Sequence, residues 1–162
     1  VELTTEMGVV SLVGTHLSPF GEPERVNEIK QIIKAQEGYE HKIVLGDLNS
    51  LSPQDDYDPS MVFAFNAMQT KKFTAKERLL FDAINAFDEA GYVDPAVIAG
   101  QEKIYTAPTS INEFQAHSNM RLDYILMSSS MVDYISSYKV VKNDLTEHAS
   151  DHYPVVVELK LQ

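Results

Sequence analysis

Hydrophobic positions along the chain follow two different periods, one typical of strands and one typical of helices. Residues 9–16 are rich in β-branched side chains, which favours a β-strand. In residues 23–36 apolar side chains recur every three or four positions, which predicts one apolar face of a helix. Pro23 suits the first turn of this helix, and Gly38 suits a stop just beyond it.

The remaining pattern predicts one more helix and several short strands. Residues 78–90 have helical spacing and are followed by Gly91, a plausible stop signal. Residues 61–76 are ambiguous between helix and strand. Alternating strands and helices, followed by clustered strands, predict an α/β sandwich layer, a mixed sheet with helices on one face. Turns or loops are predicted at residues 49–60 and 106–119, and strands at residues 42–45, 92–93, 122–127, 138–142 and 153–161.

Composition narrows the class of protein. The chain has 162 residues, of which 44% are hydrophobic, and this is near the commonest size of one globular domain. It has no Cys, which excludes a disulfide framework, a thiolate zinc site and a cysteine nucleophile. No apolar run approaches the roughly 20 residues of a membrane span, and the polar start does not resemble a signal peptide. Because the first residue is not Met, we expect a piece of a longer protein, and the compartment is left open.

The charge balance bears on the kind of partner. Thirteen basic residues against 24 acidic residues give a net charge of −11. Tight binding of duplex DNA depends on basic side chains that neutralise phosphates, so this balance disfavours duplex nucleic acid as a partner. A small phosphorylated substrate held through metal ions is compatible with it.

Side chains of catalytic types stand at four predicted strand ends. They comprise three carboxylates, two imidazoles and one carboxamide, a set suited to an oxygen-ligated metal and to proton transfer. Taken singly, each has a structural alternative, namely a hydrogen-bonded core histidine, a turn residue or a solvent-facing carboxylate. The candidates are His16, Asp47, Asn49, Asp123, Asp151 and His152.

Five motifs occur in a fixed order along the chain. They are GTHL at residues 14–17, Arg25, GDLNS at residues 46–50, RLDYIL at residues 121–126 and SDHYPV at residues 150–155. Together they resemble the endonuclease/exonuclease/phosphatase superfamily, which includes pancreatic-type DNases, abasic-site endonucleases, neutral sphingomyelinases and inositol polyphosphate 5-phosphatases. The resemblance implies the DNase-like four-layer α/β sandwich, with this chain as a single domain that corresponds to its C-terminal part.

The resemblance also implies what is missing. The N-terminal half of the family fold carries a Glu that is the main magnesium ligand, and this half has no counterpart in residues 1–162. We therefore expect an incomplete metal site and weak activity from this chain alone. The predicted strands carry apolar residues for both of their faces, so one sheet face would be open to water, and we expect the chain to self-associate or aggregate.

Roles for the candidates follow from the same resemblance. His152 would contact the scissile phosphate, with Asp123 orienting its ring, and Asp47 would orient or deprotonate the attacking water. His16 matches a second histidine of the family. Asn49 would hold a phosphate oxygen or a metal-bound water, and Asp151, Asp47 and Asn49 would hold Mg²⁺, for which Mn²⁺ could substitute. The implied activity is metal-dependent hydrolysis of a phosphoester by water, without a covalent intermediate.

The substrate and two rival functions stay open. Local positive clusters occur only at residues 71–72 and 76–78, so we favour a phosphoester that is not a nucleic acid, with nucleic acid as the alternative. Residues 61–73 are predicted as a helix packed on the sheet, or as an apolar lip for a lipid-like substrate. One rival is a catalytically silent binding module. The other is a zinc enzyme, which is disfavoured because HxH and HExxH spacings are absent.

Overall fold

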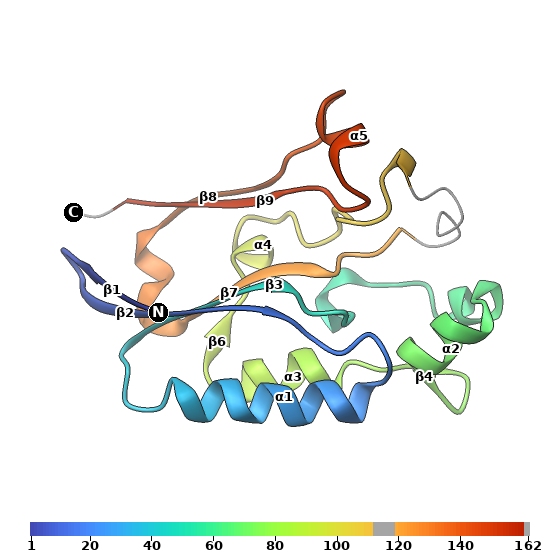
Figure 1. The fold of residues 1–162 in the computed structure, drawn as a ribbon, viewed down its shortest axis with the longest axis horizontal. Coiled ribbons are helices and arrows are strands. Elements are labelled where there is room, and N and C mark those ends of the chain that lie inside the picture. Colours follow the sequence, from blue (N-terminus) through green and yellow to red (C-terminus); the bar gives the residue numbers. More distant parts are fainter. Residues whose placement is uncertain (112–118, 161–162) are drawn as a thin grey trace.

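The computed structural model describes residues 1–111 and 119–160. Its centre is a five-stranded mixed sheet with the strand order β1-β2-β3-β7-β6 (Figure 1). Only β2 and β3 run parallel to each other in this sheet, and the other neighbours are antiparallel. The strands are β1 (Glu2–Thr5), β2 (Gly8–His16), β3 (His41–Asp47), β6 (Tyr92–Val93) and β7 (Asp123–Ser128).

Two helices cover one face of the sheet, as the lower part of Figure 1 shows. They are α1 (Glu22–Ala35) and α3 (Asp82–Glu89). The chain needs a crossover to bring β3 parallel to β2, and α1 is that crossover. Ile29 of α1 and Phe87 of α3 pack with Val44 and Leu126 of the sheet in a cluster that excludes water. This cluster is the main hydrophobic core.

A hairpin lies over the opposite face of the sheet (Figure 1). Its strands are β8 (Ile135–Val140) and β9 (Val155–Leu159), which pair antiparallel in a sheet of their own. A second buried cluster joins this layer to the central sheet; it includes Val10 and Met127. Leu12, Leu45 and Ile125 of the central sheet are only partly buried on this side.

The predicted α/β class, with a mixed sheet and helices on one face, is confirmed. The helix predicted at residues 23–36 and most of the predicted strands occur close to their expected bounds. The strand predicted at residues 153–161 is shorter, and it pairs only with β8 rather than joining the mixed sheet. In the loop predicted at residues 106–119, residues 112–118 lie outside the described residues.

The helix predicted at residues 78–90 begins later than expected. Residues 78–79 instead form strand β5 (Arg78–Leu79), which pairs with β4 (Thr74–Ala75) in a tight hairpin. Lys76 and Glu77 take positive φ angles of 49° and 60° in its turn. Asp82 then begins α3. The prediction was wrong for the first turn because helical spacing of apolar side chains cannot report the hairpin that precedes it.

Residues 61–73 do not form one helix packed on the sheet. They divide into a 3₁₀ helix, η2 (Pro59–Ala64), and a short α-helix, α2 (Ala67–Phe73), because Asn66 starts a new helix with a capping box. Phe73 is buried, but Phe63 and Met68 are 77% and 74% exposed. Among the described residues, no helix is both long and apolar enough to cross a membrane. The remaining short elements are η1 (Pro53–Asp55), α4 (Pro95–Ile98), η4 (Ser129–Tyr134) and α5 (Thr146–Ala149).

Candidate active site

The register of the central sheet places three candidate side chains in one row. His16 is the last residue of β2 and is paired with Asp47, the last residue of β3. Asp47 is paired in turn with Asp123, the first residue of β7. Since β2 and β3 are parallel and β7 runs the other way, two strand ends and one strand beginning meet at the same edge of the sheet.

Gly46 makes this row sterically feasible. Its φ angle is +135°, a backbone conformation that residues other than glycine rarely adopt. A Cβ atom at this position would lie 1.9 Å from the carbonyl oxygen of Thr15. Only glycine therefore lets β3 approach the end of β2 closely enough for His16 and Asp47 to be neighbours.

Asp47 and Asn49 shape the loop that follows β3. The backbone N–H of Asn49 donates to Oδ1 of Asp47 (2.8 Å), and its side-chain Nδ2 donates to the carbonyl oxygen of Leu17 (2.8 Å). Asn49 has a φ angle of +49°, a left-handed conformation that Asn adopts more readily than most residues. Hydrogen bonds of this kind are expected if Asp47 and Asn49 are simply turn residues, the structural alternative for this motif. They also hold both side chains at the sheet edge.

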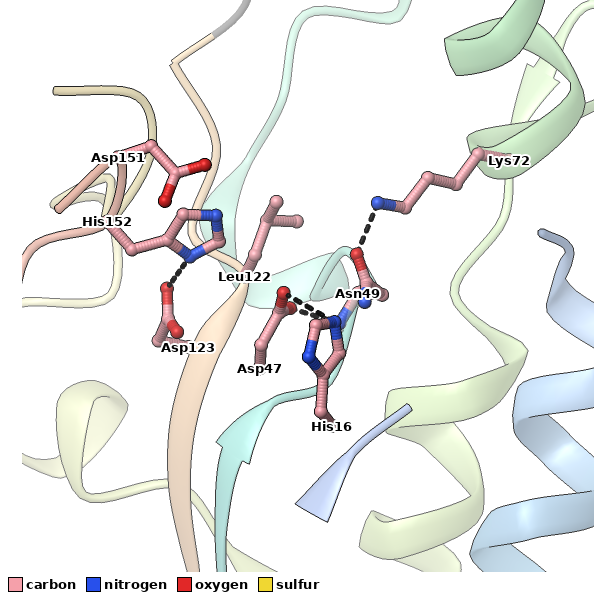
Figure 2. Close-up of a pocket in the computed structure, with 8 residues that line it drawn as sticks. All are labelled: His16, Asp47, Asn49, Lys72, Leu122, Asp123, Asp151 and His152. Atoms are coloured by element: carbon pink, nitrogen blue, oxygen red, sulfur yellow. Dashed lines mark hydrogen bonds and ion pairs between the residues drawn. The ribbon is translucent and has the colours of Figure 1, made fainter. Parts of the chain in front are cut away.

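His152 reaches the same edge from the segment before β9. Its Nδ1 lies 2.7 Å from Oδ2 of Asp123, which fixes the ring and leaves Nε2 on the side away from Asp123 (Figure 2). This hydrogen bond raises the pKa of His152 above its usual value, with smaller contributions from the charges of Asp123, Asp47 and Asp151, while burial opposes the shift. The imidazolium form is therefore favoured in the pocket.

A buried threonine that the sequence did not single out links the two partners of this bond. Oγ1 of Thr106 accepts from the backbone N–H groups of Leu122 (2.9 Å) and Asp123 (3.1 Å). Its carbonyl oxygen accepts from the backbone N–H of Tyr153 (2.7 Å). Thr106 thus sets the distance between the start of β7 and the segment that carries His152. It lies in a stretch of loop composition, which gives no sequence signal for such a role.

All six candidates line one pocket of about 380 Å³, although they come from four separate segments (Figure 2). Their placement together agrees with the sequence prediction, and their roles stay predictions. The imidazole of His16 is 70% exposed, and its Nε2 lies 3.4 Å from Oδ2 of Asp47. Two further side chains complete the lining, Leu122 and Lys72.

Lys72 is the residue at this site that sequence reasoning missed. It appeared in the sequence only as part of a positive pair on an ambiguous segment. In the structure it extends from α2 toward the pocket, and its Nζ donates to Oδ1 of Asn49 (Figure 2). Burial lowers the pKa of Lys72 to about 8, although the carboxylate of Asp47 favours the charged form.

The environment of Asp47 makes its carboxylate more basic than an exposed one. Its pKa is raised mainly by burial and further by the charge of Asp123, while the hydrogen bond from the Asn49 N–H lowers it. A carboxylate with a raised pKa accepts a proton more readily than an exposed one. Its position beside His152 suits a group that takes a proton from water.

The donor set fits a magnesium ion only in part. Within residues 1–111 and 119–160, no group of three or more His, Asp or Glu side chains surrounds a common metal position. Mg²⁺ keeps several waters and needs only one or two carboxylates, which Asp47 and Asp151 can supply. Oδ1 of Asn49 accepts a hydrogen bond from a cation, Lys72, so it is poorly placed as a metal ligand. The carboxylates fit the ion, and Asn49 does not.

Comparison with known proteins bears on the fold. No family model and no curated protein matches the sequence. An AP endonuclease from Archaeoglobus fulgidus has a similar structure, with a TM-score of 0.63, 17% identity, and coverage of 94% of this chain and 62% of its own. The 3'-5' exonuclease NExo from Neisseria meningitidis has a TM-score of 0.66, 20% identity, and coverage of 99% and 64%. The chain has the DNase-like α/β fold.

A third structure agrees with this assignment of the DNase-like fold. It is the 3' phosphatase NExo from Neisseria bound to a product DNA hairpin, with a TM-score of 0.61 and 23% identity; the match covers 86% of this chain and 52% of that one. The chain thus spans between 52% and 64% of the length of these three structures. The names of all three describe enzymes that act on phosphoesters. Because their sequences are only 17–23% identical to this chain, the similarity establishes the fold alone.

Proposed function

We propose that this protein hydrolyses phosphoesters by attack of water, using the pocket at the end of β2, β3 and β7. The observation that carries the proposal is the 2.7 Å bond between His152 Nδ1 and Asp123 Oδ2, in the same pocket as Asp47. A charged imidazole and a basic carboxylate facing one cavity are the two groups that such a reaction needs. The names of the structural neighbours, two nucleases and a phosphatase, support the same reaction class.

Each side chain has a distinct part in this proposal. Asp47 accepts a proton from the attacking water, because its pKa is raised by burial. Nε2 of His152 donates to a phosphate oxygen, since Nδ1 is held by Asp123. The imidazolium offsets the negative charge that grows on the phosphate as the water adds. His16, at the exposed rim of the pocket, places its Nε2 3.4 Å from Oδ2 of Asp47.

Magnesium is part of the proposal, with Asp47 and Asp151 as the residues that would hold it. When bound, a divalent ion would neutralise phosphate charge and lower the pKa of a coordinated water. The side chains of this chain orient the phosphate and move the proton at Asp47.

A direct test is hydrolysis of bis(p-nitrophenyl) phosphate by the 162-residue chain in the presence of Mg²⁺. We expect slow release of nitrophenolate, because the metal site of this chain is expected to be incomplete, and this release should disappear in His152→Ala. The exposed His148 makes its hydrogen bond to the backbone of Asp144, outside the pocket, so His148→Ala is the matched control. Hydrolysis that is equal in wild type and His152→Ala would contradict the proposal.

Nucleic acid is the second candidate substrate, because a structural neighbour was solved with a product DNA hairpin. The net charge of −11 weighs against it. Parallel assays with a DNA hairpin carrying a 3' phosphate and with the small diester separate the two substrates. A chain that hydrolyses neither, yet stays folded, would support the rival in which this domain is a catalytically silent binding module.

A further inference from the structure

The pocket presents a charge problem for any phosphate. Three carboxylates line it, those of Asp47, Asp123 and Asp151. A phosphoester anion is repelled by them unless cations stand nearby. His152, with Nδ1 held by Asp123, presents Nε2 on one side, and Lys72 is the only Lys or Arg among the described residues that line the pocket. Lys72 faces the pocket from the side opposite His152 (Figure 2).

The ammonium of Lys72 is held in place but is not neutralised. Its Nζ donates to Oδ1 of Asn49 and lies 4.9 Å from the centre of the Phe73 ring. Among the described residues it forms no ion pair with a carboxylate. An ammonium has three N–H donors, and one of them is used here. A partly buried ammonium that lines a cavity, has no carboxylate oxygen within ion-pair distance among the described residues and keeps further donors is suited to an anion.

The backbone at Lys72 is anchored from beneath by a buried ion pair. Nη2 of Arg25 donates to the carbonyl oxygen of Lys72 (2.6 Å) and to Oε2 of Glu22 (2.6 Å). Nη1 of Arg25 donates to the carbonyl oxygen of Ser18 (3.1 Å). Arg25 is fully buried, so the last turn of α2 is tied to α1 and to the loop after β2.

The pair also extends to the third helix. Oε1 of Glu22 accepts from the backbone N–H of Ala83 (2.7 Å), in the first turn of α3. Three helices and one loop therefore converge on the residue that carries the ammonium. The network fixes the backbone from which the Lys72 side chain extends, and the hydrogen bond to Asn49 then directs Nζ.

We propose that Lys72 binds a non-bridging oxygen of the substrate phosphate, so that the phosphate lies between Lys72 and His152, with Asn49 and Arg25 as positioning residues. This rests on the proposed function for its substrate class, a phosphoester. It assigns to the chain itself a positive charge on the Asn49 side of the pocket, where the donor set suits a metal poorly.

The test measures phosphate binding directly and without metal. The 162-residue chain is titrated with inorganic phosphate near neutral pH in the presence of a chelator, and binding is followed by calorimetry and by NMR of the protein. The variants are Lys72→Ala and Lys72→Arg, with Lys71→Ala as the control, since Lys71 is adjacent on α2 but exposed and outside the pocket. Thermal melts of each variant check the fold.

We expect Lys72→Ala to weaken phosphate binding about tenfold or more, the scale of one hydrogen bond to a charged group. Lys72→Arg should keep binding within a few-fold of wild type, because the charge and the donors persist. Lys71→Ala should bind as wild type does. A purely structural role for Lys72 would lower the melting temperature without this order of affinities.

Two results would overturn the inference: no phosphate binding by the folded wild type, or equal binding by wild type and Lys72→Ala. The hydrolysis assay separates this inference from the proposed function. If phosphate binding depends on Lys72 but no phosphoester is hydrolysed with Mg²⁺, the binding inference stands and the proposed function fails. If hydrolysis depends on His152 while Lys72→Ala binds phosphate normally, the proposed function stands and the binding inference fails.

Discussion

His152 and Asp123, which lie 29 positions apart in the sequence, are joined by a 2.7 Å hydrogen bond between Nδ1 and Oδ2. Both side chains are about three-quarters or more buried, so the bond lies in an environment of reduced polarity. The carboxylate fixes which ring nitrogen faces the pocket, and it favours the protonated ring. Asp123 therefore sets both the orientation and the favoured protonation state of the His152 ring.

The first prediction concerns the pH dependence of this pair in metal-free protein. The pKa of His152 is raised in the folded state, so folding favours the protonated ring. The pair should stabilise the fold fully below about pH 6.5, the pKa in the unfolded chain, and lose this contribution as the pH rises through the raised pKa of the folded state. NMR titration should show a lower His152 pKa in Asp123→Asn, and urea unfolding at several pH values should show a flatter profile. An unchanged pKa in Asp123→Asn would count against the bond.

The second prediction concerns turnover. Asp47→Asn and His152→Ala should each lower the rate of phosphoester hydrolysis about 100-fold or more, the scale of losing a proton acceptor or a charge-stabilising group. Steady-state kinetics and a thermal melt check each variant. Both variants should remain folded, with a modest loss of stability in His152→Ala because Asp123 then loses its hydrogen-bond partner. A large loss of stability in either variant would mean that the lost activity reports unfolding.

The third prediction concerns Gly46. Gly46→Ala should strongly destabilise the end of β3, because its Cβ would meet the Thr15 carbonyl and its φ angle is positive. Gly14 on β2 is the control, since a Cβ there has nothing within 4 Å. Chemical denaturation should show a clear loss for Gly46→Ala and a small change for Gly14→Ala. Equal effects would mean that the close approach at Gly46 is relaxed without cost.

The fourth prediction concerns the buried ion pair. Arg25→Met should destabilise the protein by about 3–5 kcal/mol, because it leaves the carboxylate of Glu22 buried without its cation. Lys30→Met on the exposed part of the same helix should change stability by less than about 0.5 kcal/mol. Urea unfolding compares the two. A near-neutral Arg25→Met would show that Glu22 is readily neutralised or hydrated.

The fifth prediction concerns self-association through the sheet face that β8 and β9 cover incompletely. Partly buried Leu12, Leu45 and Ile125 leave apolar surface there, and a second copy of the chain is the expected occupant. Light scattering should give a mass above 18.2 kDa that rises with concentration. Leu12→Glu should shift the chain toward monomer, whereas Phe63→Ser, on the exposed η2, should not. A monomer at all concentrations would contradict this prediction.

The sequence by itself determined the class of fold and predicted six of the residues that line the pocket. Strand and helix periods are local properties, so residues 9–16 and 23–36 could be assigned from apolar spacing alone. Polar residues directly after or before an apolar strand must lie at a sheet edge, which predicted the neighbourhood of Asp47 and Asp123. The same reasoning could not find the hairpin at residues 74–79, where backbone angles of Lys76 and Glu77 decide the structure.

Only the tertiary structure decided which residues complete the site. Lys72 enters the pocket because Arg25 holds the end of α2, a contact between residues 47 positions apart that no local pattern encodes. Thr106 lies in a stretch that reads as loop, yet it joins the start of β7 to the segment of His152. Asn49 was predicted to hold a phosphate oxygen, a metal-bound water or Mg²⁺; that role stays a prediction, and the structure adds that its Oδ1 accepts a hydrogen bond from Lys72. Long-range packing sets these relationships, because the partners of a buried polar group are chosen by the geometry of the whole fold.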